Sequence, residues 1–133
     1  MPLIQISLAG QPASPETIQQ LQQETTRLMA SILHKEAAVT VVSVTQLPAG
    51  AFSANGQPVT VGASLQAMIT AGTNTEADKA AFIFAAKSML TGAIGETAAP
   101  IYVALQELPA GNWGYDGKTQ AARKAERLTG GAV

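Results

Sequence analysis

The residue with the clearest chemical potential is Pro2, which directly follows the initiator methionine. Removal of Met1 would turn its ring nitrogen into a free secondary amine. An α-amino group ordinarily titrates near pH ~7.7–8.0, and apolar surroundings lower that pKa further because they disfavour the charged form. A neutral amine that is held rigidly is a good general base near neutral pH. The start of the chain therefore predicts a proton-transfer site at Pro2.

The rest of the composition excludes other kinds of chemistry. The chain has no cysteine, which excludes disulfides, thiolate catalysis and sulfur ligands for a metal. The single histidine, His34, excludes a centre built from several histidines, and we expect neither a metal nor a cofactor. Eight Lys and Arg residues against nine Asp and Glu residues provide no basic field for nucleic acid or an anionic membrane. The first residues lack the features of a signal peptide, and the longest apolar run, 80–86, is too short to span a bilayer. We therefore expect a soluble cytoplasmic protein.

The elements that would position Pro2 can be read from the first half of the chain. Residues Pro2–Leu8 alternate between apolar and polar side chains, which predicts a strand. Ser14 and Pro15 suit the cap and the first position of a helix that should end near 33–36. Apolar residues recur there with helical spacing, at Ile18, Leu21, Leu28, Met29 and Ile32, and Thr25 is a weaker member of the same stripe. A second strand is expected over 39–45, with turns at 47–50 and 55–56.

The second half repeats this plan. We expect a strand over 59–70, a helix that starts with a capping box between Thr75 and Asp78, and a fourth strand over 100–108. The apolar stripe of that helix is predicted to be Ala80, Ile83, Ala86, Met89, Leu90 and Ile94, and Gly92 or Gly95 should end it. The sequence Leu-Pro-Ala-Gly occurs at 47–50 and again at 108–111. We therefore expect a single domain, 1–133, with pseudo-repeats of about 2–57 and 60–118. A short polar helix should cover 118–128, and Gly130-Gly131 should fray.

This pattern predicts an α/β (α+β) fold of two tandem βαβ units. Each unit should pair its strands in parallel through a right-handed crossover, and together they give a four-stranded sheet with two helices on one face. We expect the other sheet face to be bare and apolar. A chain of this length cannot cover that face alone, so association into a closed cyclic oligomer is expected.

Three features together resemble the tautomerase superfamily, which includes 4-oxalocrotonate tautomerase and macrophage migration inhibitory factor. They are the Met-Pro start, the Ala-Gly pair after the first strand of each half, and the ending of Leu-Pro-Ala-Gly, an aromatic residue and Asn-Gly or Asp-Gly. The resemblance covers about 2–118, at the length of the fused members. It implies a trimer with active sites near subunit boundaries, in which the N-terminal proline transfers a proton of a small-molecule substrate.

The resemblance also implies roles for individual residues. Pro2 matches the catalytic proline, and Phe52 matches an aromatic residue that packs against substrate. Tyr102 resembles a tyrosine contributed by a neighbouring subunit, Met68 falls near an apolar pocket wall, and Lys35 falls near a cationic substrate contact. From the residues alone, Tyr102 fits a core or interface position as well, and Lys35 fits a cation at the end of a helix.

The chain departs from the family at the arginines that hold substrate carboxylates. The matching places read Gln11 or Pro12, Thr40 or Val41, and 68–73, and none is arginine. The chain's own arginines are Arg27, Arg123 and Arg127, all on predicted helices. A lost charge-assisted contact removes roughly 1.5–3 kcal/mol. A substrate with one carboxylate, or none, therefore fits better than a dicarboxylate.

Three functions follow as hypotheses. The first is a cofactor-free tautomerase or isomerase that uses Pro2 on a small 2-oxo or enol compound. The second is a proline-dependent hydratase, dehalogenase or decarboxylase, which the missing arginines disfavour. The third is a catalytically silent trimeric binding protein with the same fold.

Overall fold

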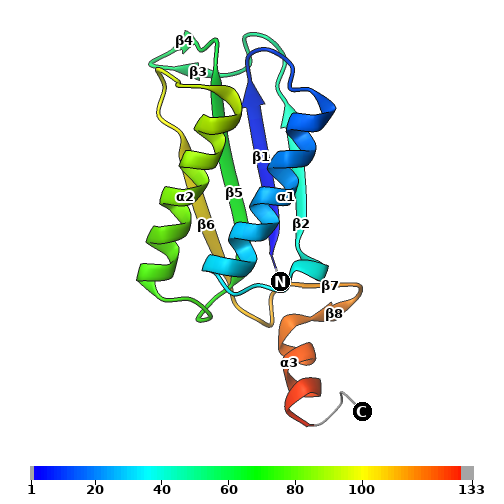
Figure 1. Cartoon of the computed structure of the whole chain (residues 1–133). Helices are drawn as coiled ribbons and strands as arrows, with labels where there is room; N and C mark the ends of the chain where they lie inside the picture. Colours follow the sequence, from blue (N-terminus) through cyan, green and yellow to red (C-terminus); the bar gives the residue numbers. More distant parts are fainter. Residues whose placement is uncertain (1, 130–133) are drawn as a thin grey trace.

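The computed structural model describes residues 2–129, which fold around a four-stranded sheet with the strand order β2-β1-β5-β6 (Figure 1). Its strands are β1 (Leu3–Ala9), β2 (Val41–Gln46), β5 (Gly62–Thr70) and β6 (Tyr102–Leu108). β1 runs parallel to β2, β5 runs parallel to β6, and β1 and β5 are antiparallel neighbours. The sheet is therefore two βαβ units joined through their first strands, as the sequence predicts.

Helices α1 (Pro15–Ile32) and α2 (Glu76–Ile94) lie side by side on one face of this sheet (Figure 1). Each begins at the predicted cap. The hydroxyl of Ser14 accepts the backbone N–H of Thr17 at 3.1 Å. Thr75 and Asp78 form a reciprocal capping box, with hydrogen bonds of 3.0 and 3.2 Å. These bonds satisfy N–H groups that the first helical turn leaves without partners.

The core lies between the two helices and the sheet. Strand residues Ile4, Ile6 and Leu65 pack there against Leu21 and Met29 of α1. The predicted stripe of α1 is largely confirmed, since its buried residues are Leu21, Thr25, Leu28 and Met29.

The predicted stripe of α2 was partly wrong. The buried residues of α2 are Phe82, Ala86 and Leu90, whereas Ile83 is 41% exposed and Ala80 is also exposed. Residues 80–86 are apolar all round the helix, so no polar face marks the side that turns outward. Packing against the sheet sets the orientation of α2. The residues that face the sheet are four positions apart, beginning at Phe82.

The expectation of an apolar bare sheet face was also wrong. Three cross-strand rows cover this face: Val41-Leu3-Met68-Gln106, Ser43-Gln5-Gln66-Ala104 and Thr45-Ser7-Ser64-Tyr102. The first row is mainly apolar, and the other two carry mostly hydroxyl and amide groups. None of these side chains is charged. A strand face in water does not need large apolar side chains. Side chains alternate between the two faces, so Ser, Thr and Gln occupy the outward positions while Ile4 and Ile6 point into the core.

Short elements adjust the predicted boundaries. A 3-10 turn, Ala37–Val39, delays β2, and a small hairpin of β3 (Ser53–Ala54) with β4 (Gln57–Pro58) delays β5. A second hairpin, β7 (Gly114–Tyr115) with β8 (Lys118–Thr119), takes the first residues of the predicted tail helix, so that α3 spans Gln120–Leu128. Both hairpins turn at the predicted Asn-Gly or Asp-Gly pair, whose residues have positive φ. Gly130-Gly131 lies outside the described residues.

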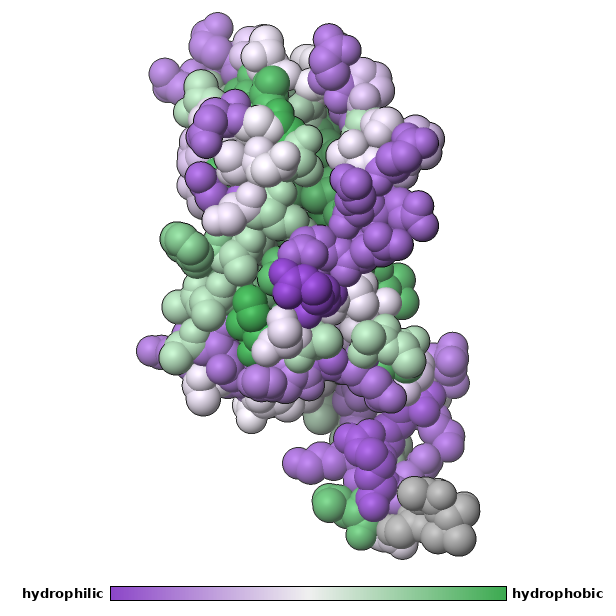
Figure 2. All heavy atoms as spheres, in the orientation of Figure 1, coloured by the Kyte–Doolittle hydropathy of each residue, from purple (hydrophilic) through white to green (hydrophobic). Residues whose placement is uncertain are grey.

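The two ends of the sheet therefore carry different structures. The β3–β4 hairpin lies at one end, while the start of β1, the β7–β8 hairpin and α3 lie at the other (Figure 1). Hydrophilic side chains gather over α1 and α3, and paler or apolar ones gather over α2 (Figure 2). Among the helices that the structure describes, none is both long and apolar enough to cross a membrane.

Candidate functional site

Pro2 lies buried at the head of β1. Its carbonyl accepts the N–H of Val41 at 3.2 Å, and the next residue, Leu3, stands opposite Met68 of β5. Side chains alternate along a strand, so Pro2 belongs to the helix-covered face, as Ile4 does. The backbone is thus fixed on both sides of the residue that the sequence singled out.

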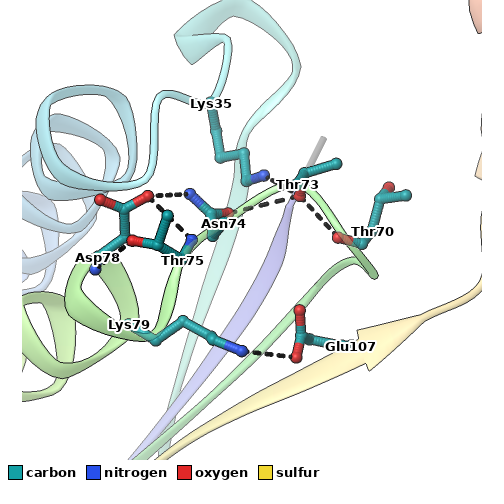
Figure 3. Close-up of polar contacts among 8 residues, drawn as sticks. All are labelled: Lys35, Thr70, Thr73, Asn74, Thr75, Asp78, Lys79 and Glu107. Carbon is teal, nitrogen blue, oxygen red and sulfur yellow. Dashed lines mark hydrogen bonds and ion pairs between the residues drawn. The ribbon is translucent and has the colours of Figure 1, made fainter.

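Lys35 reaches the same end of the sheet from the end of α1. His34 adopts a positive φ of 61° and turns the chain back, and the N–H of Lys35 then donates to the carbonyl of Met29 at 3.0 Å. The Lys35 ammonium donates to the hydroxyl of Thr73 at 2.7 Å, and that hydroxyl donates to the carbonyl of Thr70 at 2.6 Å (Figure 3). Lys35 is therefore more than a solvated helix-end cation, because the β5–α2 loop holds its ammonium group.

A second contact joins these two segments. The side-chain amide of Asn74 donates to the carbonyl of Leu33 at 2.9 Å and to the Asp78 carboxylate at 3.2 Å. The end of α1 and the start of α2 are therefore tied together beside the start of β1. This gives the site a rigid wall built from both βαβ units.

The charges in this region influence one another. Burial lowers the pKa of Lys35, and the nearby carboxylates of Glu107 and Asp78 oppose that shift. Glu107 accepts a hydrogen bond from Lys79 at 2.9 Å, and this contact lowers the pKa of its carboxyl group (Figure 3). Lys79 is thus occupied by Glu107, whereas Lys35 has no carboxylate within ion-pair distance among residues 2–129.

The C-terminal segment closes this end of the molecule. The indole N–H of Trp113 donates to the hydroxyl of Thr70 at 3.1 Å, and the Trp113 carbonyl accepts the N–H of Gln120 at 2.9 Å. These bonds hold the β7–β8 hairpin and the start of α3 against the end of β5. The indole of Trp113 thus has its hydrogen-bond partner within the chain.

A cavity of about 300 Å³ lies between the end of α1, the β5–α2 loop and the C-terminal segment. We call it the α1–α3 cavity. Its lining residues are Leu33, His34, Lys35, Glu36, Val39, Thr73, Tyr115, Gln120 and Arg127. The cavity lies at the end of the sheet where β1 begins, since Val39 precedes β2 and Thr73 follows β5, but Pro2 is not among its lining residues.

The other predicted site residues divide between the two ends of the sheet. Met68 pairs with Leu3 near the start of β1 and is half-buried, but it lies on the bare face of the sheet and Pro2 on the helix-covered face. Tyr102 is 73% exposed and lies in the same cross-strand row as Ser7, about 13 Å along β1 from Leu3 at roughly 3.3 Å per residue.

Phe52 lies farther still from Pro2. Its ring packs over Gly62, where an added Cβ would come within 2.7 Å of the ring, and Gly62 pairs with the last residue of β1, Ala9. One protomer therefore places Pro2, Lys35 and Met68 toward the same end of the sheet, with Met68 on the opposite face, and places Phe52 and Tyr102 farther along it.

Sequence reasoning missed Thr73, Gln120 and Arg127 at this end of the molecule. Gln120 and Arg127 are seven residues apart, which is two helical turns, so their shared face of α3 could have been noticed. No comparable signal marks Thr73, because only the pairing of β1 with β5 brings it near Lys35. No three His, Asp or Glu side chains of the described chain come together in a way that could hold a metal ion.

The buried Pro2, the held ammonium group of Lys35 and the α1–α3 cavity thus all lie toward the same end of the sheet. Once freed by loss of Met1, the proline nitrogen can accept a proton, and a cation can stabilise negative charge on an oxygen. Proton transfer next to a carbonyl needs those two capabilities and no more.

Comparison with known proteins supports the fold directly. No protein-family model matches the chain, and no curated protein matches it. Among solved structures, Pt0534 inactivated by 2-oxo-3-pentynoate matches with a TM-score of 0.82 and 24% identity, over 91% of this chain and 98% of that one. A fused 4-OT that forms a symmetric trimer matches with a TM-score of 0.82 and 19% identity, over 91% and 98%. A macrophage migration inhibitory factor-like protein from Entamoeba histolytica matches with a TM-score of 0.73 and 20% identity, over 89% and 97%.

These similarities extend over nearly the whole chain. The chain therefore has the same fold as these 4-OT and MIF-like structures, with two βαβ units in one four-stranded sheet. At these sequence identities the similarity supports the fold, and any activity has to be argued from the residues of this chain.

Proposed function

We propose that this protein is a cofactor-free tautomerase that uses Pro2 as general acid and base on a small 2-oxo or enol compound. The observation that carries the proposal is the buried Pro2 at the head of β1, hydrogen-bonded through its carbonyl to Val41, at the end of the sheet where Thr73 holds the ammonium of Lys35. Loss of Met1 is a required first step, since an acylated proline nitrogen has no basic lone pair.

The chemistry balances without a further reagent. The neutral nitrogen of Pro2 takes a proton from the carbon next to a carbonyl, and the bonding electrons move onto the carbonyl oxygen as an enolate. The resulting prolinium then returns a proton at the other end of the enolate system. Lys35 and nearby backbone N–H groups stabilise the negative oxygen in between.

The test is ketonisation of phenylenolpyruvate and 2-hydroxymuconate by protein whose intact mass lacks Met1. We expect Pro2→Ala to lower kcat/KM by at least about 100-fold, the range for loss of a general base. A form that keeps one extra residue before Pro2 should be inactive although it has the same fold. Equal rates for the processed wild type and Pro2→Ala would contradict the proposal.

A covalent probe adds an independent readout. The similar protein Pt0534 is inactivated by 2-oxo-3-pentynoate, an activated alkyne to which an amine can add. We expect this reagent to add one equivalent of mass to the processed protein, at Pro2, and to leave the extended form unlabelled. Labelling at a lysine alone would count against a reactive proline.

The second candidate is proline-dependent hydration, dehalogenation or decarboxylation. Turnover of 3-chloroacrylate or malonate semialdehyde at rates near those of phenylenolpyruvate would favour it. If neither class of substrate reacts and Met1 is retained in the isolated protein, the silent binding protein is the better description.

We also propose that the chain forms a homotrimer. Similar structures include a symmetric trimer of a fused 4-OT. In one protomer Phe52 and Tyr102 lie far along the sheet from Pro2, so they can serve its site only from a neighbouring copy. The uncharged bare face of the sheet is the surface that such copies would share.

A further inference from the structure

The α1–α3 cavity has the size and the charge of a small-anion site. Its volume of about 300 Å³ lies at the lower end of the range for ligand pockets, about 300–1,000 Å³. Two basic side chains, Lys35 and Arg127, line it, against the single carboxylate of Glu36. Within residues 2–129, neither cation forms an ion pair. The cavity therefore has unused positive charge.

Arg127 differs from the other two arginines in its contacts within residues 2–129. Arg27 pairs with Glu24 on the exposed side of α1. Arg123 donates to the carbonyl of Tyr115 at 2.9 Å and lies over its ring, 3.8 Å from the centroid. The guanidinium of Arg127 has neither a carboxylate nor a carbonyl partner in the described chain, and it lines the cavity from the last turn of α3.

Gln120 supplies a second, independent observation. It lines the cavity and is only 9% exposed, yet its side-chain nitrogen Nε2 is buried without a hydrogen-bond partner among residues 2–129. A buried donor without a partner costs free energy, and native proteins rarely keep one without a reason. A ligand oxygen in this cavity would satisfy it.

Lys35 points to the same kind of ligand. Its ammonium is half-buried, and burial lowers its pKa. An anion in the cavity would offset that desolvation, while the Thr73 hydroxyl keeps the ammonium in place at 2.7 Å.

We propose that the α1–α3 cavity binds the carboxylate of a small monocarboxylic 2-oxo acid, through Lys35, Arg127 and Gln120. This inference rests on the proposed function, because it names the substrate class of a tautomerase, and the cavity lies at the end of the sheet where β1 begins. The ammonium of Lys35 can contact both a carboxylate oxygen and the adjacent 2-oxo oxygen. The C-terminal segment thus supplies the guanidinium that the strands of this chain lack, and it supplies only one, which selects one carboxylate.

The direct test measures the binding of pyruvate to the full-length processed protein by NMR chemical-shift titration. We expect saturable binding, about tenfold weaker in Arg127→Gln because a charge-assisted contact is lost. Lys124→Gln makes the same charge change at an exposed position of the same helix and should leave Kd unchanged. Methyl pyruvate, which has no carboxylate, should bind weakly and equally to all three proteins.

Further variants distinguish the loss of a binding contact from misfolding of the variant protein. Arg127→Lys should recover part of the affinity, and Gln120→Leu should weaken binding if its circular dichroism matches that of the wild type. Equal Kd values for pyruvate in the wild type and Arg127→Gln, or equal binding of pyruvate and methyl pyruvate, would overturn the proposal.

The two proposals can fail separately. Pyruvate binding does not require turnover, so Pro2→Ala should bind pyruvate with the same dependence on Arg127. Binding that depends on Arg127 without turnover that depends on Pro2 would reject only the tautomerase. Turnover that depends on Pro2 with no effect of Arg127→Gln on KM for phenylenolpyruvate would reject only the carboxylate site.

Discussion

At the scale of single residues, the environment of Lys35 is the clearest indication of a functional role. A half-buried ammonium held by one hydroxyl, with no carboxylate in ion-pair distance among the described residues, is not arranged for stability. Groups whose charge is costly to bury are commonly found where a ligand or a reaction needs that charge. Lys35 therefore joins Pro2 as a residue that stability alone does not explain.

The cost of this charge can be measured. Burial lowers the pKa of Lys35 in the folded chain, whereas an unfolded lysine titrates near pH ~10.4. Between those two values the unfolded chain binds more protons, so the free energy of unfolding rises with pH. Below this window the cost is fully present, and it disappears as the pH rises through it.

We therefore expect Lys35→Met to be more stable than the wild type near pH 7, and this advantage to shrink as the pH approaches about 10.4. Urea denaturation of both proteins across that range provides the measurement. Lys87→Met, at an exposed position of α2, is the control for a general effect of losing a lysine. A difference between wild type and Lys35→Met that stays constant with pH would show that burial of the charge costs nothing.

Pro2 as a site residue stays a prediction, and the sequence alone could suggest it because the proposed chemistry depends on its place directly after Met1. The sequence alone could not suggest Thr73, Gln120 and Arg127, because their importance depends on what lies near them in space. The two aromatic candidates, Phe52 and Tyr102, remain predictions that depend on a second copy of the chain.

At the scale of secondary-structure elements, α2 is the helix whose orientation the sequence left open. Its residues 80–86 are all apolar, so a helical stripe can be drawn through several of its faces. The fold places Phe82 at 0% exposure and Phe84 at 77%. These two identical residues, two positions apart, provide an internal test.

We expect Phe82→Ala to lower the free energy of unfolding by about 3–5 kcal/mol, the cost of a cavity left by a buried phenylalanine. Phe84→Ala should change it by no more than about 0.5 kcal/mol, as for other exposed positions. Chemical denaturation of both variants measures the difference. A larger loss for Phe84→Ala than for Phe82→Ala would mean that α2 is rotated from the orientation described here.

The caps of α1 and α2 were predicted more accurately than the buried face of α2. Ser14, Thr75 and Asp78 were predicted and are confirmed, because a cap is a local event among residues three positions apart. Strand starts were less accurate, since the turn at 37–39 and the small hairpins are stabilised by the neighbouring sheet rather than by their own sequence.

At the scale of the whole molecule, the unusual surface is the bare face of the sheet. Two of its three rows consist mainly of Ser, Thr and Gln, and none of its residues is charged. A polar face without charge can remain in water, and it can also be buried against another copy without leaving an ion unpaired. Gln5 and Gln66 lie opposite each other at its centre.

If this face joins copies of the chain, one charge at its centre should separate them. We expect light scattering to give the wild type a mass about three times the 13.6 kDa of one chain, and Gln66→Lys a mass near that of a single chain. Gln19→Lys, on the exposed side of α1, should leave the mass unchanged. An unaltered mass for Gln66→Lys would place the contacts between copies elsewhere.

The sequence by itself determined the tandem βαβ plan, the helix caps, the hairpin turns and the prominence of Pro2. All of these depend on periodicity, on residues a few positions apart or on chain position. The tertiary structure decided which face of α2 is buried, the polar character of the bare sheet face, and the gathering of Lys35, Thr73, Gln120 and Arg127 around one cavity. Those features arise from strand pairing and helix packing between distant segments, and side-chain contacts of that range have no signature in the order of the residues.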